Sequence, residues 1–373
     1  KYRINYKPSL FVPVGKETKY KTLDGRYVER IKFDSMPEAT KWVNEYKNVT
    51  NFEYFGNTRH QYPFIADEFK GKIDWDMNKI KLLTIDIECE SENGFPSPEK
   101  ADQPLICITV KDHTTKKIIV FGMGNFVNDR EDVQYINCVT ETGLVETFTK
   151  FWVEYNPDII TGWNVKFFDI PYLMNRFRYL MGDEWLNQFS PWGIVEQKSA
   201  SVLFASREQQ VWNIMGVDTL DYLDLYRKFT FVRRESYKLD YIGEVELGQN
   251  KLDNPYDTFK EFYSNDYQRF VEYNIQDVEL VDKLEDKLQL IALFLTMAYE
   301  AKVNYQDVFG QVRIWDCIIY HHLRSKNIVP PAVQESKTSS GYEGAYVKDP
   351  VVGFHDWVCS FDLNSLYPHL IMQ

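Results

Sequence analysis

Two acidic residues, Asp86 and Glu88, interrupt an apolar segment whose sequence, starting at Leu82, is LLTIDIECESENGFP. The apolar residues around them predict a buried strand. Because strand side chains alternate between faces, the two carboxylates are expected on the same face of a sheet. For an isolated pair of this kind, a half-exposed strand with solvated acids is the simpler interpretation.

Two other segments place acidic residues where they could do chemistry. In TGWNVKFFDIPYLMNR, Asp169 begins a predicted helix five residues after Asn164, and an ordinary helix N-cap is the alternative. In YNIQD, Tyr273 and Asp277 are four residues apart on a strongly helical segment, so they share a face. The alternative there is the polar edge of an amphipathic helix.

These acids together predict a metal site if the fold brings them to one place. Each pair of carboxylates about 5 Å apart would repel by roughly 3 kcal/mol at an effective dielectric near 20. Such a cluster holds either protons or cations, and Mg²⁺ prefers a few carboxylates together with water and substrate phosphate. Two ions about 4 Å apart can clamp an in-line displacement at phosphorus. The pattern therefore indicates hydrolysis of a phosphodiester, with the Tyr273 hydroxyl beside the attacking water.

Alternating strand and helix patterns after residue 80 must position these side chains, and they predict an α/β domain with a mixed sheet. Strands are predicted around Asp86 and Glu88 and at 105–112, 116–123 and 158–164, with a hairpin near His113. Helices with apolar stripes are predicted at 36–48, 142–158, 169–182 and 265–302, the last as one helix or two.

The composition sets outer limits on the class of protein. Length 373, with 44% hydrophobic and 16% aromatic residues, suggests two or three domains with large cores. The five cysteines form no CxxC pair, which argues against a disulfide framework and a zinc site. A net charge of −12 weighs only weakly against nucleic acid, because a local basic groove can coexist with an acidic total. The start at Lys1 and the abrupt end at SFDLNSLYPHLIMQ predict a fragment of a larger protein.

The three acidic motifs, in their order along the chain, resemble the proofreading exonuclease motifs of family B replicative DNA polymerases, most closely those of T-even-type bacteriophages. The motif DIE is weak alone, but the block TGWNVKFFDIPYLMNR is specific and the ordered set is very specific. The segments YKPSLF, LDYLDLYRKFTF, ESYKLDYIGE and IWDCIIYHHL extend the likeness through the N-terminal and exonuclease regions, and SFDLNSLYP is similar to polymerase motif A. The resemblance thus covers nearly the whole chain.

The resemblance implies a role for each acidic residue. Asp86, Glu88, Asp169 and Asp277 would bind two Mg²⁺ or Mn²⁺ ions, and Tyr273 would orient the attacking water. These five residues form the predicted catalytic set.

The same resemblance implies four DNA-binding residues: Phe95, Asn164, Arg207 and Lys251. Phe95 would lie against frayed terminal bases, Arg207 would belong to a strand-separating hairpin, and Lys251 would approach the scissile phosphate. An ordinary loop aromatic and a solvated surface arginine are the alternatives for Phe95 and Arg207. The basic, aromatic segment YRKFTFVRRESYK could serve a single-strand channel, although burial of its aromatics would explain it as well.

Motif A implies an incomplete polymerase site. Asp362 would be a polymerase metal ligand and Tyr367 would lie under the incoming sugar, but the second catalytic Asp pair and the fingers helix are absent from this sequence. Polymerase activity is therefore expected only of the full-length protein. The predicted domains are an α+β N-terminal domain (1–80), a ribonuclease-H-like 3′-5′ exonuclease domain (81–295), a return segment completing the N-terminal domain (296–352) and the start of the polymerase palm (353–373).

The predicted function is a proofreading exonuclease that hydrolyses the 3′-terminal phosphodiester of DNA and releases deoxynucleoside monophosphates. Its predicted partners are a single-stranded or frayed primer end, the missing palm, fingers and thumb domains, and a sliding clamp bound through the missing C-terminus. No membrane is expected, and the predicted location is the cytoplasm of an infected bacterial host. A non-catalytic DNA-binding scaffold is the main alternative, and a free-standing nuclease is a second one.

Overall fold

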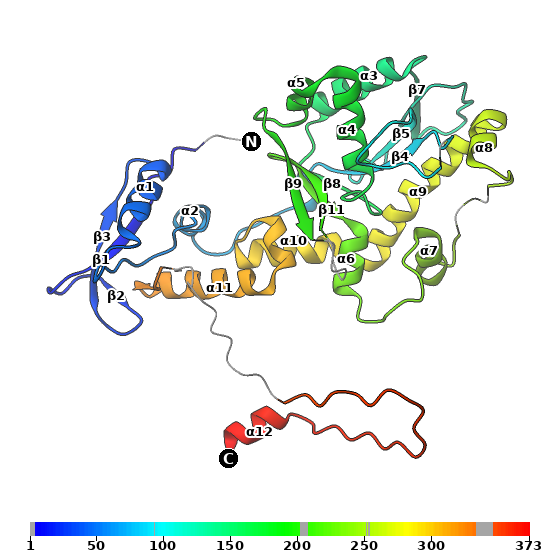
Figure 1. Ribbon diagram of the computed structural model, residues 1–373. Helices are drawn as coiled ribbons and strands as arrows, with labels where there is room; N and C mark the ends of the chain where they lie inside the picture. The colour runs from blue at the N-terminus through cyan, green and yellow to red at the C-terminus, as the bar shows by residue number, and fades with distance from the viewer. Residues whose placement is uncertain (1–3, 93, 202–207, 251, 253, 333–345) are drawn as a thin grey trace. The chain divides into compact units, whose positions relative to one another are not determined.

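The computed structural model describes residues 4–92, 94–201, 208–250, 252, 254–332 and 346–373 (Figure 1). The chain forms two compact units, residues 1–333 and 334–373, and each is described by itself. The first unit contains the sheets and helices α1 to α11, and the second contains helix α12 (Leu366–Met372).

The larger sheet of the first unit has six strands in the order β11-β8-β4-β5-β6-β7. Their bounds are β4 (Leu82–Cys89), β5 (Leu105–Asp112), β6 (Ile118–Gly122), β7 (Val133–Asn137), β8 (Ile159–Gly162) and β11 (Asp218–Asp221). Strand β4 is parallel to β8 and antiparallel to β5, and β5 and β6 form an antiparallel hairpin. The predicted mixed sheet and the hairpin near His113 are both confirmed.

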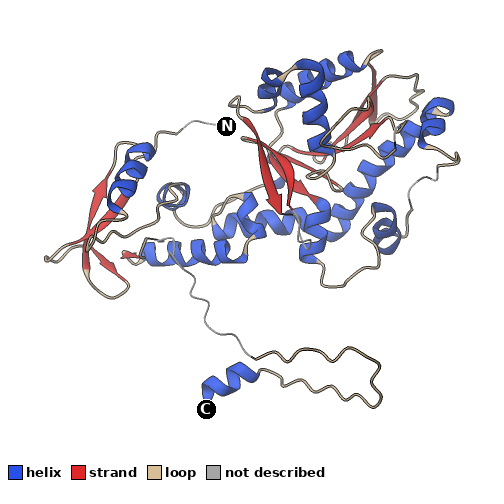
Figure 2. Ribbon diagram, viewed as in Figure 1, coloured by secondary structure: helices blue, strands red, loops and turns tan. Residues whose placement is uncertain are grey.

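Helices cover both faces of this sheet (Figure 2). On one face, α3 (Glu141–Tyr155) and α4 (Asp169–Met181) share a core with Ile85 and Ile87. On the other face, α8 (Phe259–Asn265) and α9 (Tyr267–Leu288) pack on Ile106 and Cys107. Burial of each large apolar side chain contributes about 1.5–3 kcal/mol, so both faces of the sheet are held firmly. Alternation along β4 therefore directs the isoleucines towards α4 and the acidic residues towards α9.

The helical segment predicted at 265–302 is two helices, α9 and α10 (Leu290–Ala301). Gln289 separates them with φ of 51°, a left-handed conformation that ends α9. The Glu285 carboxylate then accepts the backbone N–H groups of Ile291 (3.0 Å) and Ala292 (3.2 Å) at the start of α10. These bonds satisfy donors that a helix N-terminus leaves unpaired. Helices α6 (Tyr222–Phe229), α7 (Leu239–Leu247), α9 and α10 share one hydrophobic cluster.

A second, four-stranded sheet of the first unit has the order β1-β3-β2-β12. Its strands are β1 (Ser9–Pro13), β2 (Tyr20–Thr22), β3 (Tyr27–Lys32) and β12 (Ile328–Val329). Strand β12 follows helix α11 (Gln311–Ser325) and pairs in parallel with β2, so segments about 300 residues apart in sequence share this sheet. Helix α1 (Met36–Tyr46), predicted at 36–48, packs on it through Ala39.

The first unit contains several further short elements. They are α2 (Gln61–Glu68), α5 (Asp183–Leu186), the short 3₁₀ turns Met77–Lys79, Asn187–Phe189 and Tyr305–Phe309, and a hairpin of β9 (Val195–Ser201) and β10 (Glu208–Ile214). None of the helices in the described part of the chain combines the length and apolar content that a membrane crossing requires.

The β5–β6 hairpin is tied to α9 by a buried ion-pair cluster centred on Asp282. Its carboxylate lies 2.8 Å from the Nζ atoms of both Lys111 and Lys116, and 3.3 Å from Nδ1 of His113. Burial by itself would raise the pKa of Asp282, but the hydrogen bonds from His113, Lys111 and Lys116 outweigh it and hold that pKa well below its usual range. The ionised carboxylate therefore stabilises the fold.

Asp282→Asn is expected to lower the free energy of unfolding by about 3 kcal/mol at pH 7, as for other broken buried pairs. Because the folded pKa is depressed, the wild-type contribution is complete above the unfolded pKa of about 4 and is lost as pH falls below it. Urea unfolding at pH 7, 5 and 3 should show the gap between wild type and variant closing. The exposed neighbour Asp286, also paired with Lys116, provides the control Asp286→Asn, with an effect under about 1 kcal/mol. A gap that stays constant with pH would contradict the assignment.

Candidate active site

The candidate site lies at the edge of the six-stranded sheet where β4, β8 and β11 end. These three strands are mutually parallel, so their carboxyl ends meet at one edge, which is where open α/β sheets bind ligands. Strand β4 extends past the end of β8, because Thr84 is the last of its residues paired with β8. Asp86 and Glu88 follow on this extension, each half-buried, and the pairing with β5 shifts between Glu88 and Cys89.

Helix α9 brings a third carboxylate to this edge. One oxygen from each of Asp86, Glu88 and Asp277 lies within 4.8 Å of the others. Asp277 is only 3% exposed, so the interpretation of Tyr273 and Asp277 as the polar edge of an amphipathic helix is wrong for Asp277. Tyr273, one turn earlier, is half-buried and packs edge-on against Phe262 with ring centroids 6.0 Å apart. Three oxygen donors so close together match the ligand chemistry of a hard divalent cation.

Asp169 reaches the same edge from helix α4, on the opposite face of the sheet. Its Oδ1 accepts the backbone N–H of Ile87 at 3.1 Å, between the two acidic residues of β4. The helix has no side-chain cap and begins at Asp169 itself, so the N-cap interpretation is wrong. Burial raises the pKa of Asp169 to about 7, the nearby carboxylates of Asp221 and Asp277 add to the shift, and the N–H of Ile87 opposes it. A cation at this edge would favour the ionised form.

A buried carboxylate that sequence reasoning missed, Asp221, holds the turn between β8 and α4. It ends β11 and accepts the backbone N–H groups of Asn164 and Lys166, both at 3.0 Å. Asn164 itself has φ of 68°, so this turn is a tight one that needs such support. Burial raises the pKa of Asp221 to about 7, with a further contribution from Asp224. Asp221 therefore helps to place Asp169.

A cleft of about 920 Å³ lies at this edge of the sheet. Its lining includes all four predicted metal ligands together with Phe95, Asn164, Phe168 and Tyr273. Phe95 is 86% exposed, and its ring centroid lies 5.4 Å from that of Phe168. An exposed ring at the rim of an acidic cleft is suited to stacking against a flat ligand.

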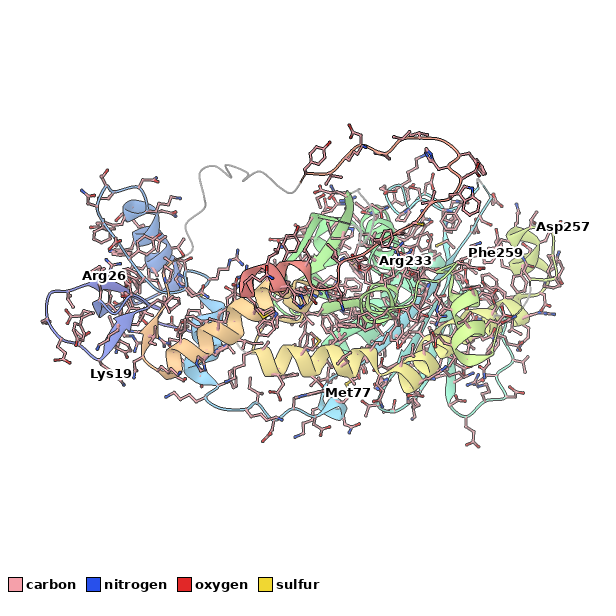
Figure 3. The ribbon with its side chains drawn as sticks, turned by 90° about the horizontal axis from the view of Figure 1, so that it is seen from below. Lys19, Arg26, Met77, Arg233, Asp257 and Phe259 are labelled. Carbon is pink, nitrogen blue, oxygen red and sulfur yellow. The ribbon has the colours of Figure 1, made fainter. Side chains whose placement is uncertain are left out.

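A basic loop between α6 and α7 leads to this cleft. Trp163 Nε1 donates to the backbone carbonyl of Tyr237 at 3.0 Å, and the next residue, Lys238, lines the cleft. Phe231, at the other end of the loop, is 99% exposed, and Arg233 is exposed as well. Figure 3 labels Arg233 in the same half of the view as Phe259, another residue of the cleft. Partial burial of the aromatics, the alternative interpretation of this segment, is confirmed for the buried Tyr226 and the half-buried Phe229 and Tyr237, and is wrong for Phe231.

The cleft lining does not settle the other four predicted site residues. Arg207 and Lys251 fall outside the described residues. Asp362 and Tyr367 belong to the second unit, where Tyr367 is in the first turn of α12.

Comparison with known proteins agrees with this architecture. A family model for the exonuclease domain of DNA polymerase family B matches residues 39–242, and one for DNA polymerase family B matches residues 306–373. The chain is 34% identical to the DNA-directed DNA polymerase of Escherichia phage RB69 and 31% identical to that of Enterobacteria phage T4, over 99% of its own length in both cases. It is also 30% identical, over 79% of its length, to the DNA polymerase delta catalytic subunit of Caenorhabditis elegans.

A mixed sheet with helices on both faces and acids at its carboxyl edge is of the ribonuclease-H-like type, as predicted. The chain belongs to DNA polymerase family B and contains the exonuclease domain of that family. It spans 43% of the length of the two phage polymerases.

Proposed function

We propose that this chain carries the 3′-5′ proofreading exonuclease of a family B replicative DNA polymerase of a bacteriophage. The observation that carries the proposal is the set of three carboxylate oxygens within 4.8 Å, two of them from Asp86 and Glu88 inside the part of the chain that matches the exonuclease domain. Asp86, Glu88 and Asp277 would hold one Mg²⁺ or Mn²⁺ ion, and Asp169, which lines the same cleft, would complete the site for a second. Bound ions would polarise the phosphodiester and lower the pKa of an attacking water.

Other residues of the cleft would then have separate roles in hydrolysis. Tyr273 would orient the water for in-line attack on the terminal phosphorus, since its ring lines the cleft one helical turn from Asp277. The P–O3′ bond breaks, the 3′ oxygen of the preceding nucleotide takes a proton, and the terminal residue leaves as a deoxynucleoside 5′-monophosphate. Phe95 would stack on the terminal base, and Asn164, which also lines the cleft, would contact the strand. Arg207 and Lys251 stay predictions.

We infer an N-terminal domain (1–80) completed by 296–352, the exonuclease domain (81–295) and the beginning of the palm at 353–373. Asp362 and Tyr367 would contribute to a polymerase site that palm, fingers and thumb complete in the full-length protein. A sliding clamp would bind outside this chain, and the protein would act on DNA in the cytoplasm of the infected host.

The test uses a 5′-labelled single-stranded oligonucleotide with Mg²⁺, and EDTA as the blank. The full chain should shorten it from the 3′ end in single-nucleotide steps, and Asp86→Ala/Glu88→Ala should leave it intact. A chain that binds the oligonucleotide but never shortens it in Mg²⁺ or Mn²⁺ would instead be the non-catalytic scaffold.

The loop between α6 and α7 gives a further prediction. Phe231→Ala/Arg233→Ala should raise KM for a single-stranded 20-mer about tenfold, because base stacking contributes about 1–3 kcal/mol and the guanidinium is lost from the strand's path. kcat, and KM for a dinucleotide too short to reach the loop, should stay unchanged.

Steady-state hydrolysis of both substrates measures this effect. The control Lys19→Ala/Leu23→Ala removes an exposed basic and an exposed apolar residue in the smaller sheet region, far from Arg233 in Figure 3. Equal losses on the 20-mer and the dinucleotide would show that the loop does not bind the strand.

A further inference from the structure

Asn274 is a fully buried polar residue on α9, one residue after Tyr273, with 0% of its surface exposed. It lies over the part of the sheet where β4 pairs with β5. In that pairing Thr109 is opposite Asp86 and Cys107 is opposite Glu88, and both β5 residues are fully buried. The side chains across from the two acids therefore share their face of the sheet and meet α9.

These residues form a chain of hydrogen bonds that ends on a candidate metal ligand. The hydroxyl of Thr109 donates to Oδ1 of Asn274, and Sγ of Cys107 donates to the same oxygen at 3.4 Å. Nδ2 of Asn274 then donates to Oδ2 of Asp86 at 2.5 Å. Burial raises the pKa of the Cys107 thiol, so this group keeps its proton and remains a donor.

The pattern permits only one orientation of the Asn274 amide. A flipped amide would set its oxygen against a carboxylate oxygen of Asp86, and neither of these oxygens can donate. That mismatch would leave buried polar atoms unpaired at a cost of about 1–3 kcal/mol each. The Asp86 carboxylate thus determines which end of the Asn274 amide faces it, and the Thr109 hydroxyl and the Cys107 thiol donate to the oxygen at the other end.

We propose that Asn274 is a positioning residue that sets the Asp86 carboxylate for metal binding, and that Thr109 acts through Asn274. This inference rests on the proposed function of the cleft. A donor on Oδ2 restricts the plane of the Asp86 carboxylate, one of whose oxygens lies within 4.8 Å of oxygens of Glu88 and Asp277. Groups that orient a metal ligand in this way typically change metal affinity by 10–100-fold when they are removed.

Direct binding of Mn²⁺, measured by calorimetry on the full chain without DNA, tests this role. Asn274→Leu keeps the branched shape of the side chain and removes both hydrogen-bonding ends, and it should weaken Mn²⁺ binding about 10–100-fold. Thr109→Val removes only the hydroxyl and should weaken binding by a smaller factor. Thr109→Ser keeps the hydroxyl and should bind Mn²⁺ as wild type does.

The double variant distinguishes a relay from two independent effects. If Thr109 acts through Asn274, then Asn274→Leu/Thr109→Val should bind Mn²⁺ no more weakly than Asn274→Leu alone. In hydrolysis assays, Asn274→Leu should need more Mn²⁺ for half-maximal rate. If Asn274→Leu fails to fold, the comparison of Thr109→Val with Thr109→Ser decides the question.

The inference is overturned if Asn274→Leu and Thr109→Val bind Mn²⁺ with wild-type affinity and only lose thermal stability in EDTA. The hydrogen-bond network would then be purely structural. Asp86→Asn is the control for the site. If wild type binds Mn²⁺ and Asp86→Asn does not, the site stands whatever Asn274 does, whereas a wild-type chain that binds no Mn²⁺ would overturn the proposed function as well.

Discussion

Asp277→Asn is expected to reduce metal-dependent 3′-end hydrolysis by on the order of 10³-fold. Asp277 supplies one of the three oxygens that lie within 4.8 Å, and it is 3% exposed, so no solvent-facing carboxylate can take its place. A bound ion contributes several kcal/mol of transition-state stabilisation, and each 1.4 kcal/mol is a factor of ten in rate. An amide has the same shape as the carboxylate, but it lacks the charge that holds a hard cation.

Measurements of stability distinguish this loss of activity from misfolding of the Asp277→Asn variant. In EDTA the variant should unfold at the same urea concentration as wild type or at a higher one, because a buried charge near Asp169 has been removed. Mn²⁺ should raise the melting temperature of wild type and leave that of the variant almost unchanged. Glu272→Gln, the same chemical change at an exposed position of α9, should alter neither property. Retention of more than about a tenth of the wild-type rate by Asp277→Asn would remove Asp277 from the metal site.

Local sequence patterns predicted most of the large domain, because each element there has a strong periodicity of its own. Strand β4 and helix α4 lie where the apolar residues place them, and α4 ends at Gly182 as predicted. The break at Gln289 was left open, since neither glycine nor proline marks it. What ends α9 there is a left-handed glutamine supported by the Glu285 carboxylate, a feature that periodicity does not register.

In the candidate site, too, local sequence patterns identified the acidic residues but not their contacts with residues distant in sequence. Motif spacing treats the four carboxylates as one set, whereas the geometry groups Asp86, Glu88 and Asp277 and anchors Asp169 separately on the N–H of Ile87. The partners that hold them were missed because they are remote in sequence.

Asp221 is 57 residues from Asn164, and Asn274 is 188 residues from Asp86. The sequence did contain a signal for Asn274, because it lies between Tyr273 and Asp277, two predicted site residues, on the same helix. Asp221 carried none, because an Asp before a short helix is commonly just a cap, and this one does also cap α6.

Gly162→Ala is expected to destabilise the protein by about 2–3 kcal/mol and to slow hydrolysis about 100-fold. Gly162 ends β8, and a Cβ atom there would lie 2.4 Å from the carbonyl oxygen of Ile85 and 2.4 Å from Val165. Neither distance is tolerable, and the first obstacle is backbone, so β4 and β8 must move apart. Ile85 immediately precedes Asp86, and a displacement of about 1 Å at a reacting centre can cost 10²-fold in rate.

Urea unfolding and hydrolysis of the labelled oligonucleotide measure the two effects of Gly162→Ala separately. Gly15→Ala is the matched control, because a Cβ at Gly15 meets nothing within 4 Å, and it should change neither stability nor rate. The two losses should also differ in their response to Mn²⁺. Mn²⁺ stabilises the Gly162→Ala variant only if its metal site can still form. If high Mn²⁺ restores the melting temperature of the variant but not its rate, the substitution has changed the alignment of the metal ligands. A variant with wild-type stability and rate would contradict the argument that the close approach of β4 and β8 at Gly162 sets the position of Asp86.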